Sequence, residues 1–256
     1  MADWTDRFSL TGRTALVTGA SKGIGAEICT VFADAGADIV AVARDQTGLN
    51  ETAQAVQGHG RQCITITADL STPDGPGVAA SAALDQCGKI DILVNSAGVA
   101  LVDSALTLSA ADWDTTMAVN VRAPFLLSQA LAPEMIKQRW GKIINISSQT
   151  GVIALDDHAA YASSKGALNA LTKSLCAEWA RHNIQVNAIC PTVVLTPMGK
   201  EVWGPKEKSQ PFIDATPLRR FGEPVEVADM ALYLASPAAE LVNGALMMIE
   251  GGYSSV

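Results

Sequence analysis

Three polar residues in the second half of the chain have the types and the spacing needed for proton transfer. Tyr161 and Lys165 are four residues apart, so on a helix their side chains lie on one face, one turn apart. A neighbouring ammonium group favours the phenolate and lowers the pKa of a tyrosine from its usual value of about 10. Such a tyrosine can act as acid or base toward a carbonyl oxygen. Ser148, which follows an apolar run, could hold the same oxygen by a hydrogen bond as charge develops.

A tyrosine and a lysine at this spacing are, taken alone, more often a half-exposed pair on a helix surface. The segment Thr18–Gly25, with the sequence TGASKGIG, favours the functional interpretation. Glycines permit a tight turn and let backbone N–H groups and a helix N-terminus approach a pyrophosphate. The spacing GxxxGxG differs from the general GxGxxG fingerprint, and a plain glycine-rich turn is the alternative. Because the segment lies between an apolar run and a helical pattern, we expect it to bind a dinucleotide. The expected contacts are Gly19, Ser21, Lys22, Gly23, Ile24 and Gly25.

The end of the second apolar run bears on the choice between NAD and NADP. An acidic residue there usually binds the ribose 2′-hydroxyl, whereas a nearby arginine accommodates a 2′-phosphate. The sequence has Ala43 and then Arg44 at this point, and Lys22 is a second cation that could reach the same phosphate. Asp45 comes one place later, where it could cap the following helix. The pattern predicts NADP(H), with NAD as the alternative if both cations are ordinary exposed residues.

Seven short apolar runs rich in β-branched residues alternate with longer segments of helical periodicity. The runs are Thr14–Val17, Ile39–Val42, Ile64–Thr67, Ile90–Val94, Lys142–Ile146, Ile184–Ile189 and Ala245–Ile249. Continuous hydrophobicity is typical of parallel strands that are buried on both faces. We therefore predict a doubly wound α/β fold of the Rossmann type, with a seven-stranded, mostly parallel sheet and helices on both faces. Such sheets bind ligands at the carboxyl ends of their strands.

Apolar residues at three- and four-residue spacing predict helices between these runs. The predicted helices are Gly23–Ala35, Thr47–Val56, Pro73–Cys87, Ser109–Arg139, Tyr161–His182 and Val225–Leu234. Pro124 and Pro133 should kink or break the fourth of them. Residues 198–217 contain prolines and lysines with weak periodicity, so we expect a mobile substrate flap there.

Length and composition limit the classes of protein to which the chain can belong. Its 256 residues, 48% apolar and 17% charged, fit one well-buried domain over residues 1–256. A net charge of −8 argues against nucleic-acid binding, because nucleic-acid binders carry a clustered basic face. No apolar run reaches the ~20 residues of a membrane span and the N-terminus is acidic, so we expect a cytoplasmic protein without membrane contact. The five cysteines and three histidines lack ligand-like spacing, which predicts reduced cysteines and no metal.

Together these motifs resemble those of the short-chain dehydrogenase/reductase family, and the resemblance covers nearly the whole chain. It rests on the glycine segment, Asn95-Ser96-Ala97-Gly98, Asn120, Ser148 and the YxxxK motif of Tyr161 and Lys165. The family usually has asparagine where this chain has Ser96, a change that we interpret as structural. Ser147 is a rival for the serine role, but Ser148 has the family's spacing to Tyr161.

The resemblance implies a role for each matching residue. Tyr161 is expected to be the proton donor and acceptor, and Ser148 to orient the carbonyl group. Lys165 is expected to hold the nicotinamide ribose and to lower the pKa of Tyr161, and Asn120 to keep a water molecule in the proton relay. Further cofactor-binding positions are Asp69 beside the adenine, Leu70, Asn95 as support for the central strand, Ala97, Gly98, Pro191, Val194 and Thr196.

Within the family, the chain resembles the L-xylulose/dicarbonyl reductases most. The shared features are Gln149 after Ser148, His158 three residues before Tyr161, the Pro-Thr-Val-Val stretch from Pro191, then Met198-Gly199 and Trp203. Gln149, His158 and Trp203 are accordingly expected to line the substrate site with Ser148 and Tyr161, around a small hydroxylated carbonyl compound. A hydrogen-bonded helix entry for His158 and a flap anchor for Trp203 are equally good interpretations. The family also implies a homotetramer.

Two other functions are consistent with parts of this pattern. A 3-oxoacyl thioester reductase shares every catalytic residue but needs a basic surface for an acidic carrier protein, for which the candidates are Arg122, Arg219 and Arg220. A nucleotide-binding sensor without turnover would keep the glycine segment but lose Tyr161 or Lys165, and both are present. We expect an NADP(H)-preferring oxidoreductase that interconverts a carbonyl group, in a ketose, a polyol-derived ketone or a dicarbonyl, with a secondary alcohol.

Overall fold

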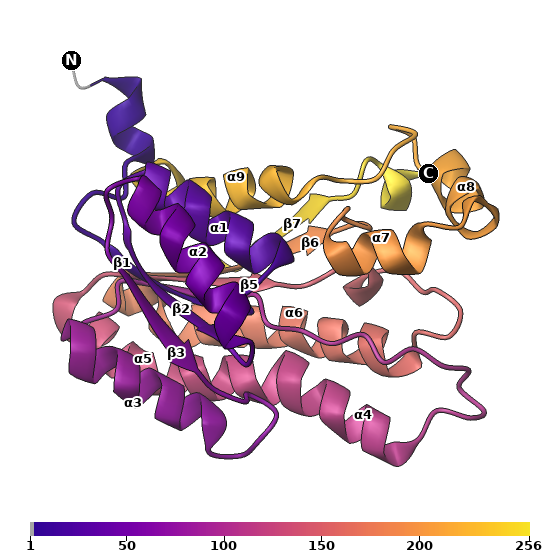
Figure 1. The fold of residues 1–256 in the computed structure, drawn as a ribbon, viewed down its shortest axis with the longest axis horizontal. Coiled ribbons are helices and arrows are strands. Elements are labelled where there is room, and N and C mark those ends of the chain that lie inside the picture. Colours follow the sequence, from indigo (N-terminus) through magenta and orange to yellow (C-terminus); the bar gives the residue numbers. More distant parts are fainter. Residues whose placement is uncertain (1–2) are drawn as a thin grey trace.

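A seven-stranded sheet forms the centre of the computed structural model, which describes residues 3–256 apart from the side chains at positions 198, 201 and 202 (Figure 1). The strands are β1 (Thr14–Thr18), β2 (Asp38–Ala43), β3 (Cys63–Thr67), β4 (Ile92–Asn95), β5 (Gly141–Ile146), β6 (Ile184–Pro191) and β7 (Leu246–Ile249). Their order is β3-β2-β1-β4-β5-β6-β7, and each neighbouring pair is parallel. The predicted seven-stranded doubly wound sheet is confirmed.

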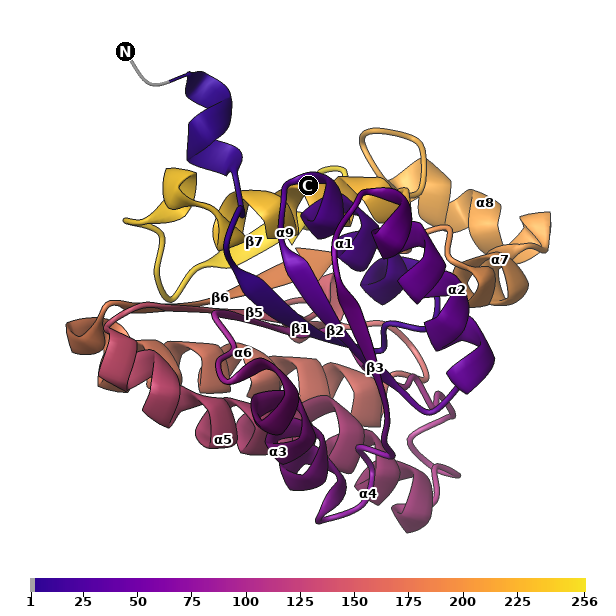
Figure 2. The ribbon, with the colours of Figure 1, turned by 60° about the vertical axis from the view of Figure 1, so that its left-hand side comes forward.

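Helices cover both faces of this sheet (Figures 1 and 2). One face carries α1 (Gly23–Asp34), α2 (Gln46–Gly58) and α9 (Pro224–Ala235), and the other carries α3 (Gly75–Cys87), α5 (Ala123–Gln138) and α6 (Ala159–Trp179). Because successive side chains of a strand point to opposite faces, neighbouring residues of β5 enter different cores. Ile144 packs among the side chains of the first face and Ile143 among those of the second, both fully buried.

The fourth predicted helix is interrupted shortly before Pro124 and continues through Pro133. It consists of α4 (Ala110–Met117), a π-helical turn η2 (Ala118–Arg122) and α5. The turn precedes Pro124, which occupies the first turn of α5, whereas α5 continues through Pro133. Pro133 removes the hydrogen bond to the carbonyl of Gln129, and both residues are exposed, so water can satisfy that carbonyl. The predicted break at Pro133 was therefore wrong, and a kink there stays a prediction.

The predicted flap contains two helices that the weak periodicity did not reveal. They are α7 (Pro197–Trp203), capped by Thr196, and α8 (Lys206–Ala215). The ends of this excursion meet at its base, where Leu195 N–H donates to the Gly222 carbonyl at 2.8 Å and Gly222 N–H donates to the Val193 carbonyl at 2.9 Å. The flap therefore leaves the sheet and returns to it at one point, beside the carboxyl end of β6.

None of the helices formed by residues 3–256 is both long and apolar enough to cross a membrane. Within the same residues, no group of three histidine, cysteine, aspartate or glutamate side chains could bind a metal ion.

Lys142, near the amino end of β5, is a buried lysine whose ammonium nitrogen has no hydrogen-bond partner among the described residues. The nitrogen lies 5.9 Å from the centre of the Trp140 ring. Burial lowers the pKa of Lys142 from 10.5 to about 8, with Arg13 acting in the same direction and Glu240 opposing it. The charged form is thus a cost to the folded state.

Replacing Lys142 with methionine should raise the free energy of unfolding at neutral pH by about 1–3 kcal/mol, because methionine keeps the apolar volume without a charge to desolvate. Native Lys142 loses its proton as the pH rises through about 8, whereas the unfolded chain keeps it up to 10.5. Wild-type stability therefore rises over that interval, and the advantage of the variant should shrink. Urea unfolding at about pH 7 and about pH 10 measures this.

The matched control is Lys137→Met on α5, where the lysine side chain is 77% exposed and the change should stay within about 0.5 kcal/mol. A Lys142→Met protein less stable than wild type at neutral pH would contradict the prediction.

Candidate active site

The helix α6 presents Tyr161 and Lys165 at the carboxyl edge of the sheet. Lys165 is only 4% exposed, and its Nζ donates a hydrogen bond to the Ile146 carbonyl, the last of β5, at 2.8 Å. The same nitrogen lies 5.5 Å from the centre of the Tyr161 ring. One donor of the ammonium group is thus used to fix α6 to β5, and its other two protons can reach a ligand beside Tyr161.

Ser148 follows β5 and caps the short 3₁₀ turn η3 (Gln149–Gly151). Its Oγ accepts hydrogen bonds from the N–H of Thr150 at 3.2 Å and from the hydroxyl of Thr150 at 3.0 Å. Because both contacts use lone pairs, the Ser148 proton can be donated to a carbonyl oxygen. Ser147, the rival, instead donates into the protein interior, to Asn169 Oδ1 at 2.7 Å. The geometry favours Ser148.

The electrostatics of Tyr161 differ from the sequence prediction. Burial raises the pKa of Tyr161 above its usual value, and a hydrogen bond with Ser148 opposes this only in part. Burial lowers the pKa of Lys165 to about 8, against a smaller raising effect of Cys190. The pKa of Tyr161 is thus raised rather than lowered, because desolvation is the largest effect on it. The expected effect of Lys165 on this pKa stays a prediction. Tyr161 is a neutral phenol at neutral pH, ready to donate a proton.

Asn120 lies on the π-helical turn η2 and is 1% exposed. Its Oδ1 accepts from the N–H of Val99 at 2.9 Å, and its Nδ2 donates to the Val99 carbonyl at 2.9 Å and to Ser164 Oγ at 3.0 Å. The side chain thus joins the loop after β4 to α6, one residue before Lys165. π-helical turns often mark functional sites. The expected water at Asn120 stays a prediction.

The glycine segment forms a tight cradle at the start of α1. Gly19 has a φ of +66°, and a Cβ there would lie 2.9 Å from the backbone of Ala97. A Cβ on Gly25 would lie 2.4 Å from the Gly19 carbonyl oxygen, and one on Gly23 would lie 3.1 Å from Thr196 Cγ2. The loop therefore has Ala97 on one side and Thr196 on the other. A side chain at any of these three positions would fill the cradle. The open space left by the glycines fits a dinucleotide pyrophosphate at the N-terminus of α1.

The opposite side of the cradle is set by the loops after β2 and β3. Asp45 accepts a hydrogen bond from the Thr47 N–H at 3.1 Å and so caps α2, as the sequence suggested. Arg44 is then the charged group at the end of β2. Two hydrogen bonds from Ser71 hold the pKa of Asp69 below its usual value, with a smaller contribution from Arg44. Lys22 and Arg44 are exposed beside this edge.

Asn95 supports the middle of the sheet. It is 2% exposed, and its Nδ2 donates to Oδ1 of Asn145, its register partner on β5, at 2.8 Å. Asn145 in turn donates to Thr172 of α6 at 2.9 Å. The sequence analysis did not identify Asn145 or Thr172, whose roles depend on strand pairing rather than on a motif.

Gln149, His158 and Trp203, which were predicted to line the substrate site, each have a different set of contacts. Gln149 is 2% exposed, and its Oε1 is buried without a hydrogen-bond partner among the described residues. His158 precedes α6, contacts the Asp156 carbonyl through Nδ1 at 2.5 Å and packs edge-on against Tyr161 at 6.1 Å. Trp203 packs against Phe212 and other aromatic rings of the flap, as the anchoring alternative holds. Substrate contact stays a prediction for all three.

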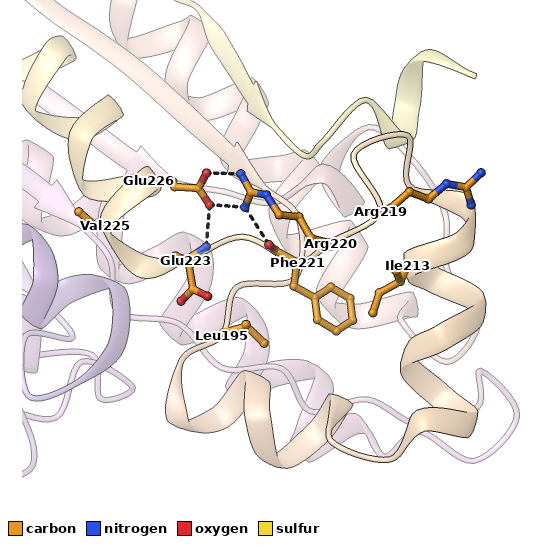
Figure 3. Close-up of a pocket in the computed structure, with 8 residues that line it drawn as sticks. All are labelled: Leu195, Ile213, Arg219, Arg220, Phe221, Glu223, Val225 and Glu226. Carbon is orange, nitrogen blue, oxygen red and sulfur yellow. Dashed lines mark hydrogen bonds and ion pairs between the residues drawn. The ribbon is translucent and has the colours of Figure 1, made fainter.

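A cavity of about 590 Å³ lies beside the flap and contains none of the catalytic residues (Figure 3). It is lined by Leu195, Ile213, Arg219, Arg220, Phe221, Glu223, Val225 and Glu226. Arg220 makes two hydrogen bonds to the Glu226 carboxylate, which lower the pKa of Glu226 to about 2. This ion pair joins the end of the flap to α9. The charge of Arg220 in the cavity wall is therefore neutralised by Glu226.

Comparison with known proteins agrees with this geometry. Residues 19–254 match the family model described as enoyl-(acyl carrier protein) reductase. The chain is 42% identical to the D-threitol dehydrogenase of Mycolicibacterium smegmatis over 248 residues, covering 96% of this chain and 95% of that one. It belongs to the short-chain dehydrogenase/reductase family. The chain is accordingly an oxidoreductase, and the catalytic roles of Asn120, Ser148, Tyr161 and Lys165 stay predictions.

Other members of the family are similar over nearly their whole length. The NAD-dependent glycerol dehydrogenase of Listeria innocua is 40% identical, covering 96% of both chains. The L-xylulose reductase of Bos taurus is 39% identical, covering 95% of this chain and 97% of that one, in agreement with the resemblance to that group. The crystal structure of a gluconate 5-dehydrogenase from Burkholderia cenocepacia with NADP and tartrate superposes with a TM-score of 0.94 at 35% identity, covering 99% of this chain and 100% of that one.

The pKa of Lys165 predicts the alkaline limb of the pH–rate profile. The rate of carbonyl reduction should fall as the pH rises through about 8, because Lys165 then loses the charge that binds a ribose and supports the phenolate left by proton transfer. Steady-state kcat/KM over a pH series measures this. The variant Lys165→Arg keeps its charge at every pH used, so it should be slower and lack this fall. The same fall in both proteins would assign the titration to another group.

Proposed function

We propose that the chain is an NADP(H)-preferring dehydrogenase/reductase that interconverts small polyols and ketoses or dicarbonyls. The observation that carries the proposal is that Oε1 of Gln149, the residue after Ser148, is buried without a hydrogen-bond partner among the described residues. A buried acceptor without a partner is costly, and a substrate hydroxyl would satisfy it. Polyols supply such hydroxyls next to the reacting carbon, whereas an acyl chain does not. Relatives that act on threitol, glycerol and L-xylulose support the same class.

The residues divide the chemistry between them. When bound, the nicotinamide would supply or accept the hydride at the carbonyl carbon. Ser148 donates a hydrogen bond to the carbonyl oxygen as negative charge develops there, and Tyr161 transfers its phenolic proton to that oxygen. Lys165 would bind the ribose hydroxyls with its free protons while it stays bonded to Ile146. In the direction of alcohol oxidation Tyr161 accepts the proton instead.

The preference for NADP(H) rests on Lys22 and Arg44. The carboxylate of Asp45 caps α2. Arg44 is therefore the charged side chain at the end of β2 that can meet the ribose of a cofactor. Two cations suit a 2′-phosphate, whereas a ribose 2′-hydroxyl needs an acceptor. The relatives include both an NAD-dependent enzyme and a structure with NADP, so this choice is our proposal.

We also propose a homotetramer in the cytoplasm. A groove of about 530 Å³ between α4, α5 and α6 is lined by Phe125, which is 38% exposed, and Leu171, and the edge strand β7 is only half-buried. Apolar surface of this kind suits subunit contacts, as the family implies.

The alternative, a 3-oxoacyl thioester reductase, finds less support on the surface. Arg220 is paired with Glu226 and Arg219 with Asp214, and Arg122 donates to the Ser71 carbonyl. Of these three arginines, only Arg122 has no carboxylate partner among the described residues, which offers little positive charge to an acidic carrier. The second alternative is a nucleotide-binding sensor without turnover. A sensor does not need Ser148, Tyr161 and Lys165, so their presence favours an enzyme.

Steady-state oxidation of NADPH and NADH should show turnover of ketoses or α-dicarbonyls, with NADPH preferred. The panel comprises L-xylulose, L-tagatose, 2,3-butanedione and a 3-oxoacyl thioester, with D-threitol and galactitol in the reverse direction. Tyr161→Phe is the control, because it should bind nucleotide but lose turnover by a factor on the order of 100–10,000. Turnover of the thioester alone would promote the alternative reductase.

Replacing Arg44 with aspartate should invert the cofactor preference, since a carboxylate there accepts from the 2′-hydroxyl and repels the 2′-phosphate. The ratio of kcat/KM for NADPH to that for NADH measures this, and it should fall by about 100-fold or more, equivalent to a charge-assisted contact of roughly 3 kcal/mol. Arg61→Asp, two residues before β3 and thus at the amino edge of the sheet, is the charge-matched control; it removes an ion pair with Asp38 but should leave the ratio unchanged. An unaltered ratio in Arg44→Asp would show that Arg44 does not meet the phosphate.

A further inference from the structure

Asn169 occupies the catalytic face of α6 without belonging to any of the motifs above. It lies one turn beyond Lys165 and two turns beyond Tyr161, so the three side chains share one side of the helix. Only 5% of Asn169 is exposed. A buried amide must find hydrogen-bond partners, and the partners that Asn169 finds decide what it does.

The two ends of the Asn169 amide bind on either side of Ser148. Its Oδ1 accepts from Ser147 Oγ at 2.7 Å, and its Nδ2 donates to the Gly151 carbonyl at 3.3 Å. Ser147 directly precedes Ser148, and Gly151 ends the η3 turn that Ser148 caps. One side chain thus spans the turn that carries the catalytic serine.

The packing around this amide leaves little freedom. A Cβ on Gly151 would lie 2.5 Å from Asn169 Nδ2 and 3.0 Å from the carbonyl carbon of Lys165. Ser147 Oγ also lies 3.3 Å from the Lys165 carbonyl oxygen, and Cys190 Sγ at the end of β6 lies 3.9 Å from Asn169 Oδ1. The turn after β5, the helix α6 and the end of β6 therefore meet at this one side chain.

We propose that Asn169 is a positioning residue for hydride transfer: its amide fixes the turn that bears Ser148 against the helix that bears Tyr161. These two residues must hold one carbonyl oxygen between them, and a displacement of about 1 Å can cost about 100-fold in rate. The contacts of Asn169 set that spacing from behind, without touching the substrate. The proposal rests on the oxidoreductase function above.

A double-mutant cycle with Ser148 tests the proposal. Asn169→Leu keeps the volume and removes both hydrogen bonds, and it should lower kcat by about 10–100-fold while the Kd of NADPH stays within about twofold. In the Ser148→Ala background the same substitution should lower kcat less than about threefold, because the group that it displaces is already gone. Asn169→Ala is the second variant, should the leucine protein fold poorly. Equal losses in both backgrounds, or an unchanged kcat in the single variant, would overturn the proposal.

Asn187→Leu is the matched control for a general loss of stability. Asn187 is 1% exposed and its side chain also makes two hydrogen bonds, to the Val242 carbonyl at 2.8 Å and from the Ala245 N–H at 2.9 Å, but neither partner belongs to α6 or to the turn that bears Ser148. Its replacement should lower the melting temperature as much as Asn169→Leu does and leave kcat within about threefold of wild type.

The cycle uses whichever of L-xylulose, D-threitol or 2,3-butanedione supports turnover by the wild-type protein. If none does, the proposed function fails, and hydrogen–deuterium exchange tests the positioning role separately. The N–H groups of Thr150 and Gly151 bond to Ser148, so they should exchange faster in Asn169→Leu than in wild type, and no faster than wild type in Asn187→Leu. Unchanged exchange at these two positions in Asn169→Leu would overturn the positioning role.

Discussion

The catalytic edge depends on the hydrogen bond from the buried Lys165 ammonium to the Ile146 carbonyl. A charged group with so little exposure needs a partner, and the last carbonyl of β5 needs a donor because the strand ends there. Each group satisfies the other. Their bond fixes α6 along β5, and with it the position of Tyr161 relative to Ser148, two residues beyond Ile146. The chemistry of the site therefore follows from how a parallel sheet ends.

A second layer of buried amides fixes the sheet beneath that bond. Asn95 on β4 donates to Asn145 on β5, and Asn145 donates to Thr172 on α6. This chain of hydrogen bonds begins on β4, beside the point between β1 and β4 where the strand order reverses and where open sheets form their ligand crevice. Thr18 of β1 adds to it by accepting from the N–H groups of Ser96 and Ala97, each at 3.0 Å. The glycine cradle and α6 are thus attached to one polar framework, in which Asn95 Oδ1 is buried without a hydrogen-bond partner among the described residues.

Features that depend on local sequence could be predicted, and features that depend on packing could not. The strands follow from continuous apolar runs, and the pairing of Tyr161 with Lys165 follows from helical spacing alone. Asn169 could not be identified, because its partners Ser147 and Gly151 are 22 and 18 residues away and only the packing of α6 on β5 brings them together. The raised pKa of Tyr161 has the same origin, since desolvation is a property of the folded site. The helices of the flap were missed because Pro205 and Pro211 disturb the periodicity, while aromatic contacts such as that of Phe212 with Tyr253, 4.7 Å between ring centres, stabilise them.

The distribution of burial separates the candidate catalytic residues from those proposed to select the substrate and the cofactor. Ser147, Lys165 and Asn169 are buried, Ser147 donates to Asn169, and the Lys165 ammonium donates to the Ile146 carbonyl, so replacing any one of these side chains leaves a buried partner unsatisfied. Lys22 and Arg44, by contrast, are exposed, and each can be replaced without disturbing the core. The flap is similarly independent, because it leaves and rejoins the sheet at Val193–Leu195 and Gly222. In the function proposed above, proton transfer is therefore tied to the fold, whereas the choice between NAD and NADP and the choice of substrate depend on positions that can change without unfolding the protein.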